Sequence, residues 1–107
     1  MPKISLAIEP TFQAKVFIPV PGSKPEALQF TFKYRTKDEL ETHRKELAER
    51  QGDISDVDVV MSVAEGWELD DSFSAENVGR LLQKYHAAAN AIGETYIKEL
   101  MQAKLGN

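Results

Sequence analysis

The chain has 107 residues, of which 42% are hydrophobic and 28% charged, values typical of a soluble globular protein that forms one domain over residues 1–107. Its net charge of −4 and its scattered Lys and Arg argue against a nucleic-acid partner, and the lack of cysteine excludes disulfides, thiolate nucleophiles and cysteine-bound zinc. No apolar run approaches the roughly 18 residues of a membrane span, so we expect a cytoplasmic protein that is neither exported nor held in a membrane.

The first third of the chain has the two-residue alternation of β-strands. Strands are predicted at about residues 14–20 and 27–35, and Pro21 to Pro25 form the turn between them. The segment 3–8 also alternates before Pro10, so it is a candidate third strand at a sheet edge. The side chains that form the expected buried rows of the two main strands are Val16, Ile18, Val20, Leu28, Phe30, Phe32 and Tyr34.

Two helices are predicted next, each with a capping residue. Thr36 and Glu39 form a capping box before a helix at about 37–51, which has few apolar residues and should lie on the surface. Ser55 caps a helix at about 56–65, although its valines leave a strand open as an alternative.

A long helical pattern occupies the last third of the chain. Ser74 is a cap, and Phe73 and Val78 have the spacing of a hydrophobic staple, so a helix should run over about 75–103. An interruption near His86 is compatible with the pattern. The resulting class is α+β, with an N-terminal antiparallel β-hairpin or three-stranded sheet followed by three or four helices.

The sequence offers few groups for chemistry. His43 and His86 are isolated, without the spacing of a metal or catalytic motif. The acidic run from Glu65 to Asp71 lacks the ligand pattern of a calcium loop, and no serine or glycine motif for nucleophilic or nucleotide chemistry occurs. We therefore expect no catalytic residues, no metal and no cofactor.

Apolar residues in and after the acidic run admit two interpretations. They can close the core by holding the last helix on the sheet, or some of them can dock a partner. Small residues of the last helix, from Ala87 to Gly93, would also allow close approach of another helix and hence a homo-oligomer. The candidate partner-binding surface comprises Trp67, Leu69, Phe73, Tyr85, Ile92 and Tyr96.

Several stretches spread over nearly the whole chain carry a family likeness. They are Ile4 to Phe12, Phe30 to Lys33 with Arg35 and Thr36, Ser55 to Val57, Gly66 with Trp67, Phe73 with Ser74, and Tyr96 to Leu100 with Ala103, Leu105, Gly106 and Asn107. Together they resemble the tail assembly chaperones of long-tailed bacteriophages and prophages. The resemblance implies a small protein of the host cytoplasm that coats the tape measure protein and keeps it soluble until tail-tube subunits polymerise around it. It implies no reaction and no cofactor.

Three functions are therefore compared. The first is a tail assembly chaperone that binds the tape measure protein, with tail-tube subunits as further candidate partners. The second is a structural virion protein, such as a tail-tube or head-to-tail completion component. The third is an enzyme, which would require a deep cavity lined by His86 or by the carboxylates of Glu65 to Asp71.

Overall fold

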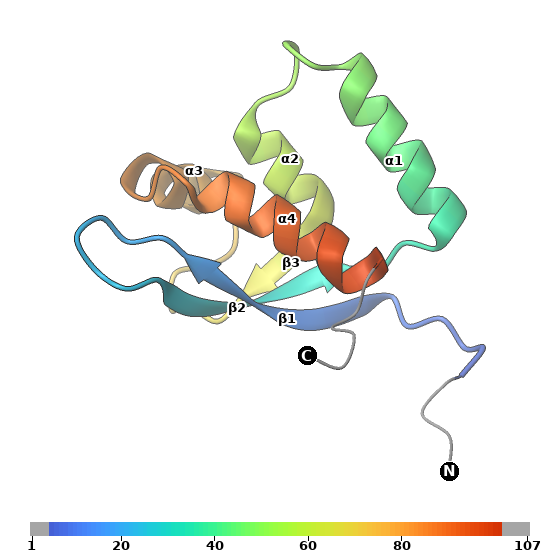
Figure 1. The fold of residues 1–107 in the computed structure, drawn as a ribbon, viewed down its shortest axis with the longest axis horizontal. Coiled ribbons are helices and arrows are strands. Elements are labelled where there is room, and N and C mark those ends of the chain that lie inside the picture. The colour runs from blue at the N-terminus through green and yellow to red at the C-terminus, as the bar shows by residue number, and fades with distance from the viewer. Residues whose placement is uncertain (1–4, 102–107) are drawn as a thin grey trace.

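The computed structural model describes residues 5–101, which form a three-stranded antiparallel sheet and four helices (Figure 1). This arrangement confirms the predicted α+β class. The helices lie on one face of the sheet and leave the other face uncovered (Figure 1). In chain order the elements are β1 (Thr11–Ile18), β2 (Glu26–Lys33), α1 (Lys37–Glu49), α2 (Asp56–Val63), β3 (Ala64–Trp67), α3 (Ala75–Lys84) and α4 (Ala88–Met101).

Strands β1 and β2 form the predicted hairpin. Thr11 pairs with Lys33 and Ile18 with Glu26, so both strands lie slightly earlier in the sequence than the alternation indicated. Pro19 follows Ile18, the last paired residue of β1. Gly22 takes a φ of 77° in the connection, a conformation that favours glycine.

The third strand is not the segment predicted at 3–8. Within the described part of that segment, residues 5–8 form no strand, and residues 3 and 4 lie outside the described residues. Strand β3 comes instead from residues 64–67, of which the first two were assigned to the preceding helix. Ala64 is extended, with φ −122° and ψ 154°, because the chain leaves α2 there and pairs with the free edge of β2.

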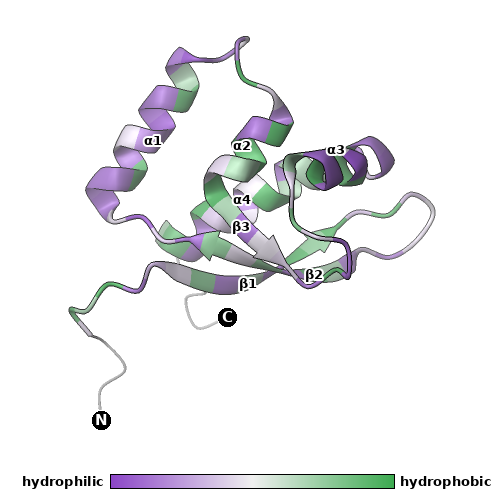
Figure 2. Cartoon of the chain, turned by 180° about the vertical axis from the view of Figure 1, so that it is seen from behind, coloured by the Kyte–Doolittle hydropathy of each residue, from purple (hydrophilic) through white to green (hydrophobic). Residues whose placement is uncertain are grey.

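The first two helices begin at the predicted caps, Thr36 and Ser55. Thr36 accepts from the Glu39 amide at 3.2 Å, and the Glu39 carboxylate accepts from the Thr36 amide at 2.8 Å. Ser55 and Asp58 form the same reciprocal pair before α2. Helix α1 is largely hydrophilic (Figure 2), and it buries only Leu40 and His43.

The helix predicted over 75–103 is divided into α3 and α4 by residues 85–87. Tyr85 is extended, with φ −116° and ψ 96°, and its N–H still donates to the Leu81 carbonyl, so α3 ends there. Ala88 then donates to the Tyr85 carbonyl as α4 begins. The interruption therefore lies where the sequence allowed it, around His86, and residues 102 and 103 lie outside the described residues.

The core lies between the sheet and α2, α3 and α4. Its centre is a series of aromatic rings, in which Phe32 lies 5.4 Å from Tyr96 and 5.7 Å from Phe30 between ring centroids. Helix α4 therefore packs on the hairpin through ring contacts. The buried apolar residues are Val16, Ile18, Leu28, Phe30, Phe32, Leu40, Val60, Val63, Ala64, Val78, Ala88, Ile92 and Tyr96.

Candidate protein-binding site

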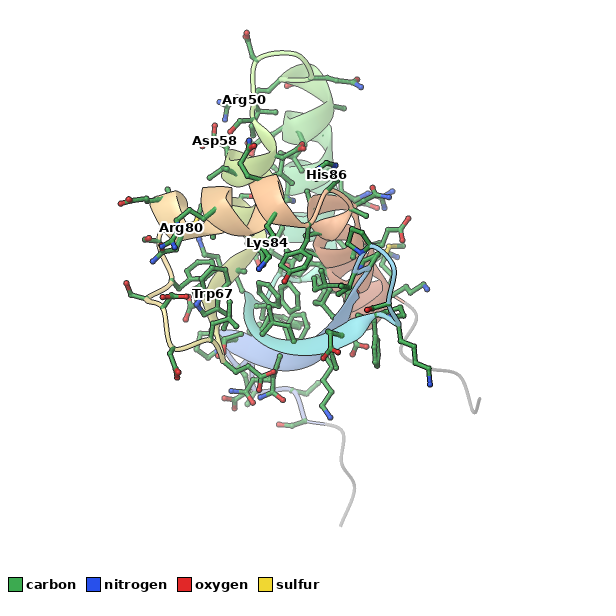
Figure 3. All side chains as sticks on the ribbon, turned by 90° about the vertical axis from the view of Figure 1, so that its left-hand side faces the viewer. Arg50, Asp58, Trp67, Arg80, Lys84 and His86 are labelled. Atoms are coloured by element: carbon green, nitrogen blue, oxygen red, sulfur yellow. The ribbon has the colours of Figure 1, made fainter. Side chains whose placement is uncertain are left out.

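Trp67 and Phe73 of the predicted surface are half-buried and pack on the domain itself. The Trp67 ring meets Phe73 edge-on at 5.0 Å and Phe30 edge-on at 6.0 Å between centroids. Its indole N–H donates to the Asp71 carbonyl at 2.7 Å. Figure 3 shows Trp67 beside the sheet, and these contacts use most of its surface in closing the core.

Leu69 is the one exposed residue of the predicted set, and Tyr85 is half-buried like Trp67 and Phe73. Leu69 is 39% exposed in the acidic connection after β3. Tyr85 is half-buried, and the Lys84 ammonium lies 5.4 Å from its ring centroid. The two residues belong to separate segments, so the structure does not unite them with the rest of the predicted set.

Ile92 and Tyr96 face the core, with exposures of 0% and 1%. Both side chains therefore belong to the core and present almost no exposed surface. The Tyr96 hydroxyl donates to the Lys33 carbonyl at 2.8 Å and accepts from the Arg35 guanidinium at 3.0 Å. Burial raises the pKa of this phenol, and its hydrogen bonds tie α4 to the end of β2.

An open groove of about 850 Å³ lies between α1, α2 and α4. Helix α1 is held to the domain mainly near its N-terminal end, and the small residues Ala89 and Gly93 of α4 fill little of the space opposite it. The apolar lining is made by residues from all three helices, namely Leu47, Val59, Val63, Ala89, Gly93 and Ile97. Its polar and charged lining is made by His43, Arg44, Asp56, His86, Asn90, Glu94, Tyr96 and Lys98.

His43 in the wall of this groove has one hydrogen-bonded nitrogen and one without a partner. The Ser62 hydroxyl donates its only proton to the Val59 carbonyl at 2.6 Å, so it accepts from His43 Nε2 at 3.0 Å. This assigns the ring proton to Nε2 and leaves Nδ1 as an acceptor. Nδ1 is buried and has no hydrogen-bond partner within residues 5–101.

The surroundings of His43 favour its neutral form. Burial lowers the pKa of the imidazole below its ordinary value of 6.5, and the nearby positive charge of Arg35 lowers it further. At neutral pH, Nδ1 is therefore an unprotonated lone pair. A buried acceptor without a partner costs about 1–3 kcal/mol.

His43 and His86 both line the groove. His86 lines it, while the carboxylates of Glu65 to Asp71 do not. Among residues 5–101, no three His, Cys, Asp or Glu side chains are grouped so that they could hold a metal ion. None of the helices in this part of the chain combines the length and apolarity that crossing a bilayer requires.

Sequence reasoning missed the groove as a site, although it contained one signal of it. The run of small residues in the last helix indicated that something could approach closely there. The apolar residues of α1 and α2 that face this run could not be placed opposite it from periodicity alone. Aromatic residues drew attention instead to the region of Trp67.

The comparisons with known proteins give one match. The family model described as "Phage tail assembly chaperone" matches residues 1–107, the whole chain. No curated protein and no solved structure matches the chain significantly.

Proposed function

The chain belongs to the phage tail assembly chaperone family, and from this premise we propose that it binds the tape measure protein and keeps it soluble during tail assembly. In this proposal the protein acts in the host cytoplasm by binding alone, without catalysing a reaction and without a cofactor. A tape measure protein is long and helical, and amphipathic helices that expose apolar stripes aggregate unless something covers them.

The groove between α1, α2 and α4 is the observation that best supports this proposal. Its walls are helices and its apolar lining includes Val59, Ala89 and Ile97, which suits the stripe of an amphipathic helix. Gly93 and Ala89 would let the backbone of a docked helix come close to α4. The groove is open, so a helix that continues beyond it at both ends can occupy it.

The edges of the groove add polar recognition to the apolar lining. Arg44 and Lys98 supply positive charge, and Asp56 and Glu94 supply negative charge. These charged side chains can pair with the charged residues that flank the apolar stripe of a docked helix. Such pairs fix the orientation of the helix more than they raise its affinity.

The test is co-expression with the tape measure protein of the same phage or prophage, with the soluble tape measure fraction as readout. Wild type should raise this fraction and co-purify with the tape measure protein. Gly93→Leu should abolish both effects because it fills the groove. A Cβ at Gly93 meets nothing within 4 Å, so the variant should fold, which circular dichroism can check.

Leu69→Lys is the matched control, since it alters an exposed apolar residue of the originally predicted surface. If Leu69→Lys abolishes tape measure binding while Gly93→Leu preserves it, the binding site lies near Trp67 and its assignment to the groove is wrong. If wild type itself leaves the tape measure protein insoluble and does not co-purify, the proposed function fails. Tail-tube subunits are tested as a second partner in the same pull-down.

Mature particles provide a separate check. A chaperone leaves the tail once assembly is complete, so the protein should be absent from purified particles. Its presence there in stoichiometric amount would instead indicate a structural virion protein.

A further inference from the structure

Strand β1 has an unpaired edge. The strand order is β1-β2-β3, and within residues 5–101 β1 pairs only with β2. The Tyr34 N–H donates to the Pro10 carbonyl at 2.9 Å, so Pro10 and every second residue after it direct their backbone groups toward β2. The backbone N–H and C=O groups of the alternate residues therefore point to the free edge, and these residues are Thr11, Gln13, Lys15 and Phe17.

An apolar segment leads into this strand. Residues 5–10, which we call the arm, expose Leu6 by 97% and Ile8 by 64%. These are the two most exposed large hydrophobic side chains of the described residues, and they stand two positions apart as in a strand. The arm forms no strand, and the Ala7 N–H donates to the Ser5 hydroxyl at 3.1 Å instead.

The arm is badly placed to pair with the free edge of its own β1. It runs straight into β1 through Pro10, whose carbonyl is already bonded to Tyr34. Folding back would require a tight reversal at Glu9 and Pro10, directly before β1 begins. A second copy of the chain presents the same free edge without this restriction.

We propose that two copies pair β1 with β1 in antiparallel orientation, so that each arm extends along the β1 edge of the other copy. Residues that lie opposite each other share a face of the sheet, so even positions must oppose even positions. Placing Phe12 opposite Phe12 satisfies this rule. Ile8 then lies opposite Val16 of the second copy, and Leu6 lies opposite Ile18.

Charge selects this register over its neighbours. With Phe12 on the two-fold axis, Glu9 lies opposite Lys15 of the second copy, and symmetry repeats the pair. A shift by two residues in either direction would place Glu9 opposite Gln13 or Phe17 and lose both pairs. Glu9 and Lys15 are exposed in the single copy, so both are available for this contact.

The prolines fit the same arrangement. Pro10 has its nitrogen on the side of β2, so its missing N–H costs nothing at the new interface. Pro19 falls at a position that would face the second copy, and it ends the ladder just after Phe17. The interface would bury Leu6 and Ile8 on the helix-covered face, beside residues that already belong to the core.

The experiment measures the mass of the full chain by size-exclusion chromatography with light scattering over a range of concentrations. Wild type should be a dimer, and Glu9→Lys and Lys15→Glu should each weaken it about tenfold, because each creates two pairs of like charge. The double variant Glu9→Lys/Lys15→Glu should restore wild-type affinity. If Glu9 or Lys15 instead stabilised the fold of the single copy, exchanging their charges would not restore the affinity of the dimer.

A second set of variants tests the arm. Leu6→Lys/Ile8→Lys should give a monomer with an unchanged circular dichroism spectrum, since both side chains are exposed in the single copy. Leu69→Lys, at an exposed leucine far along the chain from the arm, should leave the dimer intact. A wild-type monomer at all concentrations, or a dimer that is insensitive to the charge exchange, would overturn the proposal. Neither result bears on tape measure binding.

Discussion

The region around Trp67 and the groove between α1, α2 and α4 use apolar residues in opposite ways. Around Trp67, large rings meet edge-on and the indole N–H forms a hydrogen bond, so the apolar surface packs within the domain itself. In the groove, small residues such as Ala89 and Gly93 face apolar residues of α1 and α2 without filling the space between them. Large aromatic side chains therefore mark where this domain closes, and small ones mark where it stays open.

The largest effect expected from this comparison is on stability. Trp67→Ala should lower the free energy of unfolding by about 3 kcal/mol, because it removes two ring contacts and a hydrogen bond from the edge of the core. Ile97→Ala in the groove should cost about 1 kcal/mol, since Ile97 is half-buried. Chemical denaturation measures both, and equal costs would show that the groove is as much a part of the core as Trp67.

A smaller effect is expected from pH, through His43 in the groove wall. Its folded pKa is lowered, so the unfolded chain takes up the proton more readily. The contribution of His43 to stability is therefore fully present above the ordinary value of 6.5 and is lost as pH falls from there through the folded pKa.

His43→Gln removes this titration while its amide can still donate to Ser62. The free energy of unfolding of wild type should fall more steeply below pH 6.5 than that of the variant, as measured by denaturation at a series of pH values. Parallel curves would contradict the assignment of a neutral, buried His43.

The smallest effect concerns Gly93, which lies in the middle of α4. Gly93→Ala should stabilise the domain by about 0.5–1 kcal/mol, because alanine loses less backbone entropy in a helix and its Cβ meets no atom within 4 Å. Thermal unfolding measures the gain. Gly79→Ala in α3 is a useful comparison, since a Cβ there would lie 3.7 Å from Val57 in ordinary contact.

Gly93→Ala and Gly93→Leu separate the effect of Gly93 on helix stability from its effect on the space in the groove. The alanine tests helix propensity, and the leucine tests whether the empty space is used for binding. A leucine variant that is stable and still solubilises the tape measure protein would show that the groove is open for another reason.

Local signals in the sequence predicted most of the fold. The alternation around Phe30 and Phe32 identified β2, and the capping box at Thr36 and the cap at Ser55 located the starts of α1 and α2. These predictions succeeded because side-chain alternation and helix capping depend on neighbours within a few residues. The likeness to tail assembly chaperones, carried by the same stretches, agrees with the family match over residues 1–107.

The third strand and the binding surface could not be predicted in this way. Residues 64 and 65 continue a helical pattern, yet they leave α2 because the edge of β2 offers hydrogen bonds that no local signal reveals. Tyrosine is common at protein interfaces, so the sequence suggested an exposed Tyr96. In the structure its hydroxyl is instead hydrogen-bonded to the end of β2 in the core. In both cases a contact between distant parts of the chain decided the outcome.

The sequence by itself determined the two strands of the hairpin, most of the helices and where they begin, and which family the chain resembles, since short-range spacing and composition carry that information. Only the tertiary structure decided that α4 faces α1 and α2 across an open groove. It also decided that, within residues 5–101, His43 Nδ1 lacks a partner and β1 has a free edge beside an exposed arm. The physical reason is that an empty space or an unpaired group is defined by what the rest of the chain leaves uncovered, which no residue specifies alone.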